Sequence, residues 1–418
     1  MNWFLHIVSI IVIQFITNSV CSKMQNNVCL TYKDYYTIKN NSNCWYDFSA
    51  DSNAVEIISK HGYPVEVHKV ITLDGYILTV FRIPNYYSKT PRREPVFLQH
   101  GWMSSAAFFV AHGKESLAFE LADNGYDVWL GNFRGTEYSE EHVNLTVHDN
   151  DYWDHSADEI GMHDIPAQLE LISQATGERG NIIYIGHSLG TTSALIYSST
   201  YPKAAKHTVK LFILLAPASN LSHMRSLLFR IFGPSFGFVL DIAKNEHFLR
   251  LISQAEPLKN IANLVCLESP ELMKRCMQII NLMVSGPRTQ TEPKTVPVLL
   301  KHLPAGSSFK VTKHIADLTR NYFGKYSYGL DNYKHYGTIF PHTYDVSKIK
   351  VPVFIMYAVN DWACTKADSL RLYDSLSSNV RYGIHEISEP NFNHLDFMFG
   401  RNAKQLVNDV VLKLLLGY

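Results

Sequence analysis

The sequence predicts an α/β fold in which a mostly parallel central sheet is flanked by helices and carries an inserted helical cap. Short, almost continuously apolar segments alternate with helical stretches, which is typical of parallel strands buried on both faces. One such segment runs into Gly186-His187-Ser188-Leu189-Gly190. Between Pro217 and Val351 the alternation stops, and because one βαβ unit needs ~30 residues, roughly a hundred residues there exceed what the sheet requires. The predicted parts are a core at 23–217 and 351–418 and a cap at 218–350.

Each predicted element follows from a local pattern. A helix over 55–60 ends at His61-Gly62-Tyr63-Pro64. The segments 65–70 and 76–81 flank Asp74-Gly75, which is typical of a hairpin. The other predicted elements are strands at 95–99, 126–130, 209–217, 352–357 and 381–387, the strand that ends at Gly186, and helices at 158–175, 191–197 and 404–416.

The pentapeptide around Ser188 is predicted to be a nucleophile elbow, a sharp strand-turn-helix unit. Gly186 and Gly190 lack Cβ atoms, so the strand and the helix can approach closely on either side of a strained serine. The following N–H groups lie at the helix start, where negative charge is stabilised. With this glycine content roughly one sequence in ten would contain such a pentapeptide by chance. The prediction therefore depends on the strand before it and the helix after it.

A serine nucleophile needs a base, and the base needs an acid to orient it. Asp361 follows one predicted strand and His394 lies in the loop after the next, so the order along the chain is Ser, Asp, His. Asp368 falls in the following helix and His385 inside a strand, which makes both weaker candidates. The predicted catalytic residues are Ser188, Asp361 and His394.

Two backbone N–H groups are expected to stabilise the oxyanion. One belongs to Leu189, which follows the nucleophile. The other belongs to Trp102, in the loop after strand 95–99, where Gly101 lets the backbone turn. Because both donors are backbone groups, their side chains are free to shape an acyl site.

Composition excludes some classes of partner. Lys+Arg 38 against Asp+Glu 38 gives a formal charge of zero, which makes nucleic acid an unfavourable partner. The histidines, among them His142, His148 and His155, show no metal-ligand spacing, so no metal site is predicted. The sequence contains no glycine-rich phosphate loop, and no cofactor is expected.

Residues 1–22 have an apolar centre that is too short to span a bilayer and resemble a secretory signal peptide. No later apolar run reaches transmembrane length, so a secreted or lysosomal protein is expected. The glycosylation sequons begin at Asn40, Asn144 and Asn220. If Cys21 leaves with the signal peptide, the five cysteines that remain cannot all pair within the chain. They are Cys29, Cys44, Cys266, Cys276 and Cys364.

Several motifs spread over nearly all of the predicted mature chain together resemble the acid lipase family, which contains gastric lipases and lysosomal acid lipase. They are Gly62-Tyr63-Pro64, Leu73-Asp74-Gly75-Tyr76-Ile77-Leu78, Leu98-Gln99-His100-Gly101, Trp129-Leu130-Gly131-Asn132, Arg134-Gly135, Gly186-His187-Ser188, Asn360-Asp361 and Asn393-His394-Leu395-Asp396. The resemblance implies an α/β-hydrolase core with a cap and lid. It also implies a disulfide between Cys266 and Cys276 in the cap. Cys29 is then expected to pair with Cys44, and Cys364 to be a buried free thiol near Asp361.

The resemblance further implies a serine lipase that cleaves triacylglycerols or sterol esters at a lipid–water interface. The alternatives are a general carboxylesterase acting on soluble esters and a non-catalytic lipid-binding member of the fold. This chain has Leu189 where the family usually has Gln, Trp102 where it has Leu, and Ala358-Val359 where it has two glycines. These differences concern acyl-chain preference and substrate size, and none removes a reacting group.

Part of the cap, 221–284, is predicted to be an interfacial lid that covers Ser188 in water and opens on lipid. The apolar run 227–240 has more large apolar side chains than the sheet needs, and such a patch requires a surface to meet. Phe229, Ile231 and Phe232 are expected to contact lipid together.

Overall fold

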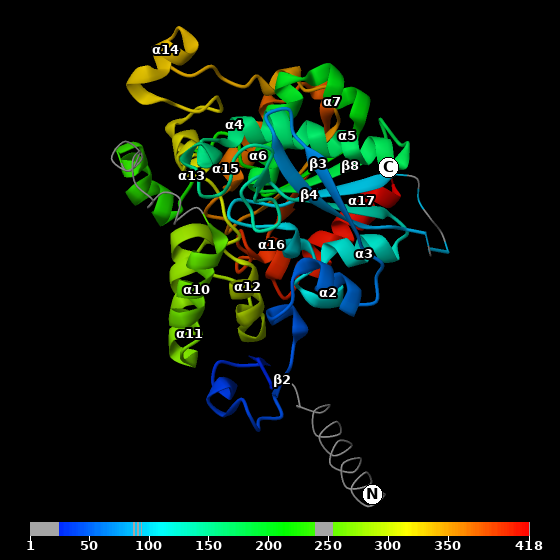
Figure 1. Ribbon diagram of the computed structural model, residues 1–418, viewed down its shortest axis with the longest axis vertical. Coiled ribbons are helices and arrows are strands. Elements are labelled where there is room, and N and C mark those ends of the chain that lie inside the picture. The colour runs from blue at the N-terminus through cyan, green and yellow to red at the C-terminus, as the bar shows by residue number, and fades with distance from the viewer. Residues whose placement is uncertain (1–24, 87, 90–91, 93, 239–253, 418) are drawn as a thin grey trace, which may run out of the picture.

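A nine-stranded, mostly parallel sheet forms the core of the protein (Figure 1). The computed structural model describes residues 25–417 except 87, 90–91, 93 and 239–253. The predicted signal peptide and the end of the apolar run 227–240 therefore lie outside the described residues. The strand order is β11-β10-β9-β8-β5-β6-β4-β3, with β7 paired to β4. Strands β5, β6 and β8 to β11 pair in parallel, whereas β3, β4 and β7 add antiparallel pairs at one side.

The predicted strands and helices are confirmed, with ends shifted by a few residues. The strands are β1 Val28–Cys29, β2 Cys44–Trp45, β3 Glu66–Ile71, β4 Tyr76–Ile83, β5 Pro95–Gln99, β6 Asp127–Gly131, β7 Glu141–His142, β8 Ile182–His187, β9 Val209–Leu215, β10 Val353–Ala358 and β11 Arg381–Ile387. The helices are α2 Ala54–Lys60, α3 Leu117–Asp123, α4 Ala157–Glu159, α5 Ile165–Thr176, α6 Leu189–Thr200, α7 Pro202–Thr208, α10 Ala255–Cys266, α11 Pro270–Ile280, α12 Val296–His302, α13 Phe309–Asp317, α14 Asn332–Tyr336, α15 Lys366–Ser375, α16 Asp396–Phe399 and α17 Asp409–Leu416. A π-helical stretch joins α4 to α5, and another precedes α17.

Burial explains the sequence pattern of the strands. Every residue of β5 and β8 is buried, which accounts for their continuous apolar sequence, while β3 at the sheet edge alternates between half-buried and exposed residues. In Figure 1, α5 and α6 lie on one side of the sheet and α3 and α17 on the other. Because β5, β6 and β8 to β11 are parallel, their carboxyl ends meet at one edge of the sheet, and the predicted catalytic residues lie there.

The predicted insertion, 218–350, falls between β9 and β10, and we call it the cap. Its described residues form helices, α10 to α14 among them, and contribute no strand to the central sheet. Figure 1 shows α10, α11, α12 and α13 together at one side of the core, while α14 stands out from the body. Across the described part of the chain, no helix has the length and apolar character needed to cross a membrane.

Two disulfides lie within the described part of the chain. One joins Cys266 at the end of α10 to Cys276 in α11, and the other joins Cys29 of β1 to Cys44 of β2. Cys364 is a buried free thiol. These are the two bonds and the free thiol expected from the sequence, and the first bond fixes two cap helices to each other.

Candidate active site

Ser188 lies at the turn between β8 and α6 in a strained backbone conformation. Its φ of 53° and ψ of −117° fall outside the ordinary regions for a residue with a side chain. A Cβ on Gly190 would lie 2.3 Å from the Gln99 carbonyl oxygen, and a Cβ on Gly186 would lie 2.7 Å from the Gly190 backbone. Both glycines are therefore required by close backbone approach, and they hold Ser188 at the carboxyl edge of the sheet.

His394 and Asp361 form a buried hydrogen-bonded pair. His394 Nδ1 lies 2.8 Å from Asp361 Oδ2, and the two residues are 5% and 3% exposed. Asp361 Oδ1 accepts hydrogen bonds of 2.8 Å from the backbone N–H groups of Ala363 and Cys364. Because an ionised carboxylate only accepts, the imidazole proton belongs on Nδ1. His394 Nε2 is then the basic atom of the ring.

The two competing residues lie elsewhere. The Asp368 carboxylate binds His223 Nδ1 at 2.8 Å and the Thr365 hydroxyl at 2.9 Å at the start of α15. His385 is a half-buried residue of β11 that pairs with Met356 of β10. The structure therefore places Asp361, and not Asp368, against His394.

An apolar cavity connects Ser188 and His394 with the cap. Its volume is about 30 Å³, which leaves room for about two water molecules. The lining residues are Trp102, Ser188, Leu189, Thr192, Ala218, Leu221, Met224, Phe229, Val284, Ile315, Leu318, Ala363, Cys364 and His394. The cap supplies Leu221, Met224 and Phe229 among them, and a cavity of this volume is too small for a long acyl chain.

The loop after β5 passes directly beside Ser188. A Cβ on Gly101 would lie 3.1 Å from the Ser188 Cβ. The His100 ring accepts the Phe133 N–H at Nε2, 3.2 Å, and donates from Nδ1 to the Gly101 carbonyl, 2.8 Å. Burial lowers the pKa of His100 to about 4, so the ring stays neutral and keeps this tautomer. Trp102 follows in the cavity wall, which Leu189 also lines, and the oxyanion role of their N–H groups stays a prediction.

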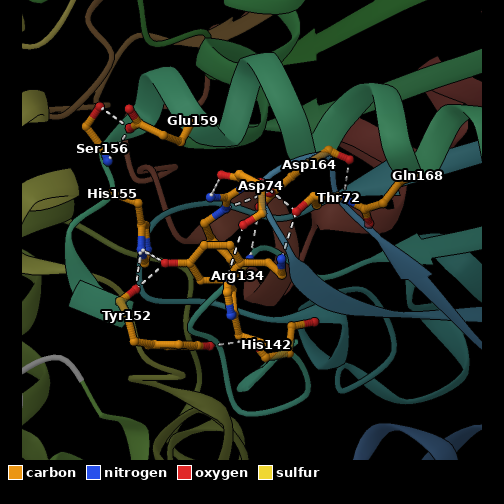
Figure 2. Close-up of polar contacts among 12 residues, drawn as sticks. Thr72, Asp74, Arg134, His142, Tyr152, His155, Ser156, Glu159, Asp164 and Gln168 are labelled. Carbon is orange, nitrogen blue, oxygen red and sulfur yellow. Dashed lines mark hydrogen bonds and ion pairs between the residues drawn. The ribbon is translucent and has the colours of Figure 1, made fainter. Parts of the chain in front are cut away.

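A charged cluster around the buried residues Arg134 and Asp164 holds the loop after β6 (Figure 2). This loop supports His100. The Arg134 guanidinium lies 2.5 Å from Asp74 Oδ2 in the β3–β4 turn and 2.6 Å from Asp164 Oδ1 at the start of α5. Its central carbon also lies 4.0 Å from the centre of the Tyr76 ring. Since Phe133 directly precedes Arg134, this cluster also holds the N–H group that binds His100.

The two carboxyl groups that pair with Arg134 have pKa values shifted in opposite directions. Burial by itself would raise the pKa of Asp74, but the hydrogen bonds and the charge of Arg134 outweigh it and lower this pKa to about 2. Burial raises the pKa of Asp164, which has no contact with solvent. Asp74 is therefore the carboxylate of the cluster that stays ionised in acid.

Asp74→Asn is expected to destabilise the protein near neutral pH and to have less effect as the pH falls. A carboxyl group with a lowered folded-state pKa stabilises the fold above its unfolded pKa of about 3.9, and this stabilisation is lost as the pH falls toward about 2. The measurement is the melting temperature of both proteins between about pH 6 and about pH 2. Asp374→Asn, at an exposed position of α15, is the control. A difference in melting temperature that does not change with pH would contradict the prediction.

Two residues that contact the His394 loop were not identified from the sequence. The His187 ring packs against the His394 ring with centroids 4.7 Å apart, and its Nε2 donates to the His394 carbonyl at 3.1 Å. Burial holds the pKa of His187 well below its usual range, so this ring is neutral. Asp396 is the second residue. The position of His187 directly before Ser188, the predicted nucleophile, was the signal available in the sequence.

One group of described residues has the spacing to hold a metal ion. The ligand atoms of Asp361, Cys364 and His394 lie within 4.8 Å of one another. Burial and the charge of Asp361 hold the pKa of the Cys364 thiol well above its usual range, so the thiol stays protonated. A protonated thiol is a poor metal ligand, and the Asp361–His394 hydrogen bond favours a role in proton transfer.

The fold and the site define the class of the protein as an α/β-hydrolase with a serine at the nucleophile elbow. A model of a partial alpha/beta-hydrolase lipase region matches residues 54–113, and a model of the alpha/beta hydrolase fold matches residues 94–400. The second match spans most of the chain and includes the serine, the aspartate and the histidine.

Curated relatives give the family. Gastric triacylglycerol lipase of Bos taurus is 32% identical over 374 residues, covering 88% of this chain and 91% of the relative. Lysosomal acid lipase/cholesteryl ester hydrolase of Homo sapiens is 32% identical over 380 residues, covering 89% and 92%. Lipase 3 of Drosophila melanogaster is 34% identical over 373 residues, covering 88% and 93%. The chain belongs to the acid lipase family and is a carboxylic ester hydrolase.

Solved structures confirm the fold. A putative lipase from Acinetobacter baumannii superposes with a TM-score of 0.53 at 15% identity, covering 89% of this chain and 97% of that structure. A soluble variant of monoglyceride lipase from Saccharomyces cerevisiae gives a TM-score of 0.51 at 14% identity, covering 89% and 98%.

Proposed function

We propose that the protein is a lipase that hydrolyses ester bonds of neutral lipids, triacylglycerols or sterol esters, through an acyl-enzyme on Ser188. The observation that carries this proposal is the apolar cavity that joins Ser188 and His394 to the inner side of the cap. The names of the bovine and human relatives, a triacylglycerol lipase and a cholesteryl ester hydrolase, support the substrate class. The division of the chain into a core, 23–217 and 351–418, and a cap, 218–350, belongs to the same proposal.

In this mechanism Ser188 Oγ attacks the ester carbonyl carbon while its proton passes to His394 Nε2. The Asp361 carboxylate stabilises the imidazolium through Nδ1, and the N–H groups of Leu189 and Trp102 bind the oxyanion. The imidazolium then protonates the leaving alcohol. In the second half His394 takes a proton from water, whose oxygen attacks the acyl-enzyme and releases the fatty acid.

The outer side of the cap supports contact with a lipid surface. Several large apolar side chains are exposed on the π-helical turn Leu228–Phe232, on the residues after it, and on α10 and α11 with the turn that follows. They are Ile231, Phe232, Phe238, Ile261, Leu264, Val265, Leu267, Ile279 and Leu282. So many exposed large apolar side chains in one part of the chain favour contact with an apolar surface, and a lipid interface provides one.

The apolar run does not act as one unit, which differs from the expectation for Phe229, Ile231 and Phe232. Ile231 and Phe232 are 62% and 46% exposed, whereas Phe229 is 3% exposed and lines the cavity. The Phe229 ring also packs on Trp102 with centroids 5.4 Å apart. We therefore assign Phe229 to the acyl site and the other two to the lipid surface.

Replacing Ile231 and Phe232 with Ser is expected to lower hydrolysis of emulsified triacylglycerol by about tenfold or more, because two large side chains no longer insert into lipid. Hydrolysis of a soluble short-chain ester is expected to change little. Phe229→Ser is expected to impair both reactions. The control replaces Val67 and Ile71, which are equally exposed on β3, with Ser.

Equal losses on both substrates from the Ile231 and Phe232 changes would contradict the interface proposal. The cap surface would then be ordinary packing, and the protein would be a general carboxylesterase.

We also propose that the chain enters the secretory pathway, with 1–22 as a signal peptide, and works outside the cell or in lysosomes. Its two disulfides support an oxidising compartment. Asn40 and Asn144 are exposed and suited to glycosylation. Asn220 is half-buried, and its amide contacts Asn321, so it is the least accessible of the three sequons.

A further inference from the structure

A buried carboxylate, that of Asp396, ties the His394 loop to the cap. Asp396 Oδ2 accepts hydrogen bonds from the backbone N–H groups of Asn393, 2.8 Å, and Gln290, 2.9 Å. Its Oδ1 accepts from the hydroxyl groups of Thr289, 2.8 Å, and Thr291, 3.1 Å. Three of these four donors belong to residues 289–291 of the cap, and the fourth directly precedes His394.

This carboxylate is costly to bury. Asp396 is 0% exposed, and none of the ion pairs found among the described residues includes it. Burial raises the pKa of Asp396 to about 6 in spite of the four donors. A buried charge without a cation adds little to stability, and an uncharged side chain would fill the same space at lower cost. The arrangement therefore points to a role in placing the loop rather than in stabilising the fold.

The residues next to His394 are tied to the cap as well. The Asn393 side-chain amide donates to Asn281 Oδ1 at 3.1 Å and to the Gly286 carbonyl at 3.3 Å. Its own oxygen accepts the N–H groups of Leu395 and Asp396 and closes the turn. His394 thus lies between two side chains whose partners are cap residues, and a shift of the cap would be transmitted to the imidazole.

We propose that Asp396 is a positioning residue for His394, which by holding residues 289–291 of the cap sets the position of the imidazole relative to Asp361 and Ser188. This inference rests on the proposed role of His394 as the base of ester hydrolysis. It makes the catalytic geometry depend on where this part of the cap sits, whereas the apolar surface around Ile231 governs contact with lipid.

The first test is Asp396→Asn, which replaces one accepting oxygen with an amide that faces the same donors. Its kcat on a soluble short-chain ester is expected to fall about 10- to 100-fold with little change in KM, because a small displacement of a catalytic group has effects of that size. Labelling of Ser188 by a serine-directed phosphonate is expected to slow in proportion. The downfield proton NMR signal of His394 Nδ1–H, which reports the bond to Asp361, is expected to shift or broaden.

A second pair of variants tests the cap side without changing the core. Thr289 and Thr291 are replaced together by Val, which removes both hydroxyl donors, or together by Ser, which keeps them. The double Val variant, called the Val protein, is expected to reproduce the loss in kcat of Asp396→Asn. The double Ser variant is expected to retain activity. This comparison also serves if Asp396→Asn does not fold.

The matched control is Asp158→Asn. Asp158 is a buried carboxylate of α4 that also joins core to cap, through the Tyr326 N–H at 2.9 Å and the Tyr344 hydroxyl at 2.5 Å, but it does not touch the His394 loop. It is expected to lower the melting temperature and to leave kcat and the NMR signal unchanged. If Asp396→Asn and the Val protein lose stability in the same way but keep kcat, the labelling rate and the NMR signal, Asp396 has only a structural role. A failure of the proposed function looks different, because wild type and Ser188→Ala would then have equal activity.

Discussion

Ser188→Ala is expected to lower kcat for ester hydrolysis by about 10⁴-fold or more while the fold stays intact. The substitution removes the only atom that can form the acyl-enzyme, and alanine fits the space at the elbow. Activity on a soluble ester, labelling by a serine-directed phosphonate and the melting temperature are the measurements. Ser198→Ala is the control, because this buried serine of α6 donates to the Ala194 carbonyl and does not line the cavity beside Ser188.

Near-normal turnover or labelling in the Ser188 variant would contradict the mechanism. Absence of turnover and of labelling in the wild-type protein would instead favour a lipid-binding member of the fold that does no chemistry. The two results are separated by the wild-type measurement alone.

Asp361→Asn is expected to lower kcat by about 10³- to 10⁴-fold. The amide oxygen would keep the hydrogen bonds from the N–H groups of Ala363 and Cys364, so the NH₂ group would face His394. Nδ1 would then have to accept a hydrogen bond, and the imidazole proton would move to Nε2, the atom that must take the proton of Ser188. The ring would be in place with the wrong tautomer.

The control for this variant is Asp368→Asn, which disrupts the contacts of this carboxylate with His223 and with the Thr365 hydroxyl and leaves the bond between Asp361 and His394. It is expected to lower the melting temperature with little effect on kcat. A larger loss of activity from Asp368 than from Asp361 would reverse the assignment of the catalytic acid.

The sequence determined which strands precede the predicted catalytic residues and the order Ser, Asp, His along the chain, because each of these features is a local pattern. Glycine on both sides of Ser188, continuous apolar strands, and polar loops after β10 and β11 depend on a few neighbouring residues. Parallel strands then bring their carboxyl ends to one edge of the sheet. That geometric rule places Ser188, Asp361 and His394 near one another without knowledge of any contact.

Disulfide pairing came from the family resemblance and from proximity in sequence. The spacing of Cys266 and Cys276 did not establish their pairing, whereas the structure brings the ends of α10 and α11 together.

Only the tertiary structure decided which side chains of the cap face the serine and which face outward. Phe229 and Ile231 are two residues apart in one apolar run, and hydrophobicity does not distinguish them, but one lines the cavity and the other is exposed. The same holds for Asp396. In the sequence it is one more charged residue near a loop, and only the fold shows that the distant segment 289–291 donates hydrogen bonds to its carboxylate. Local pattern is encoded by neighbouring residues, whereas burial and hydrogen-bond partners depend on which distant segments of the folded chain pack against each other.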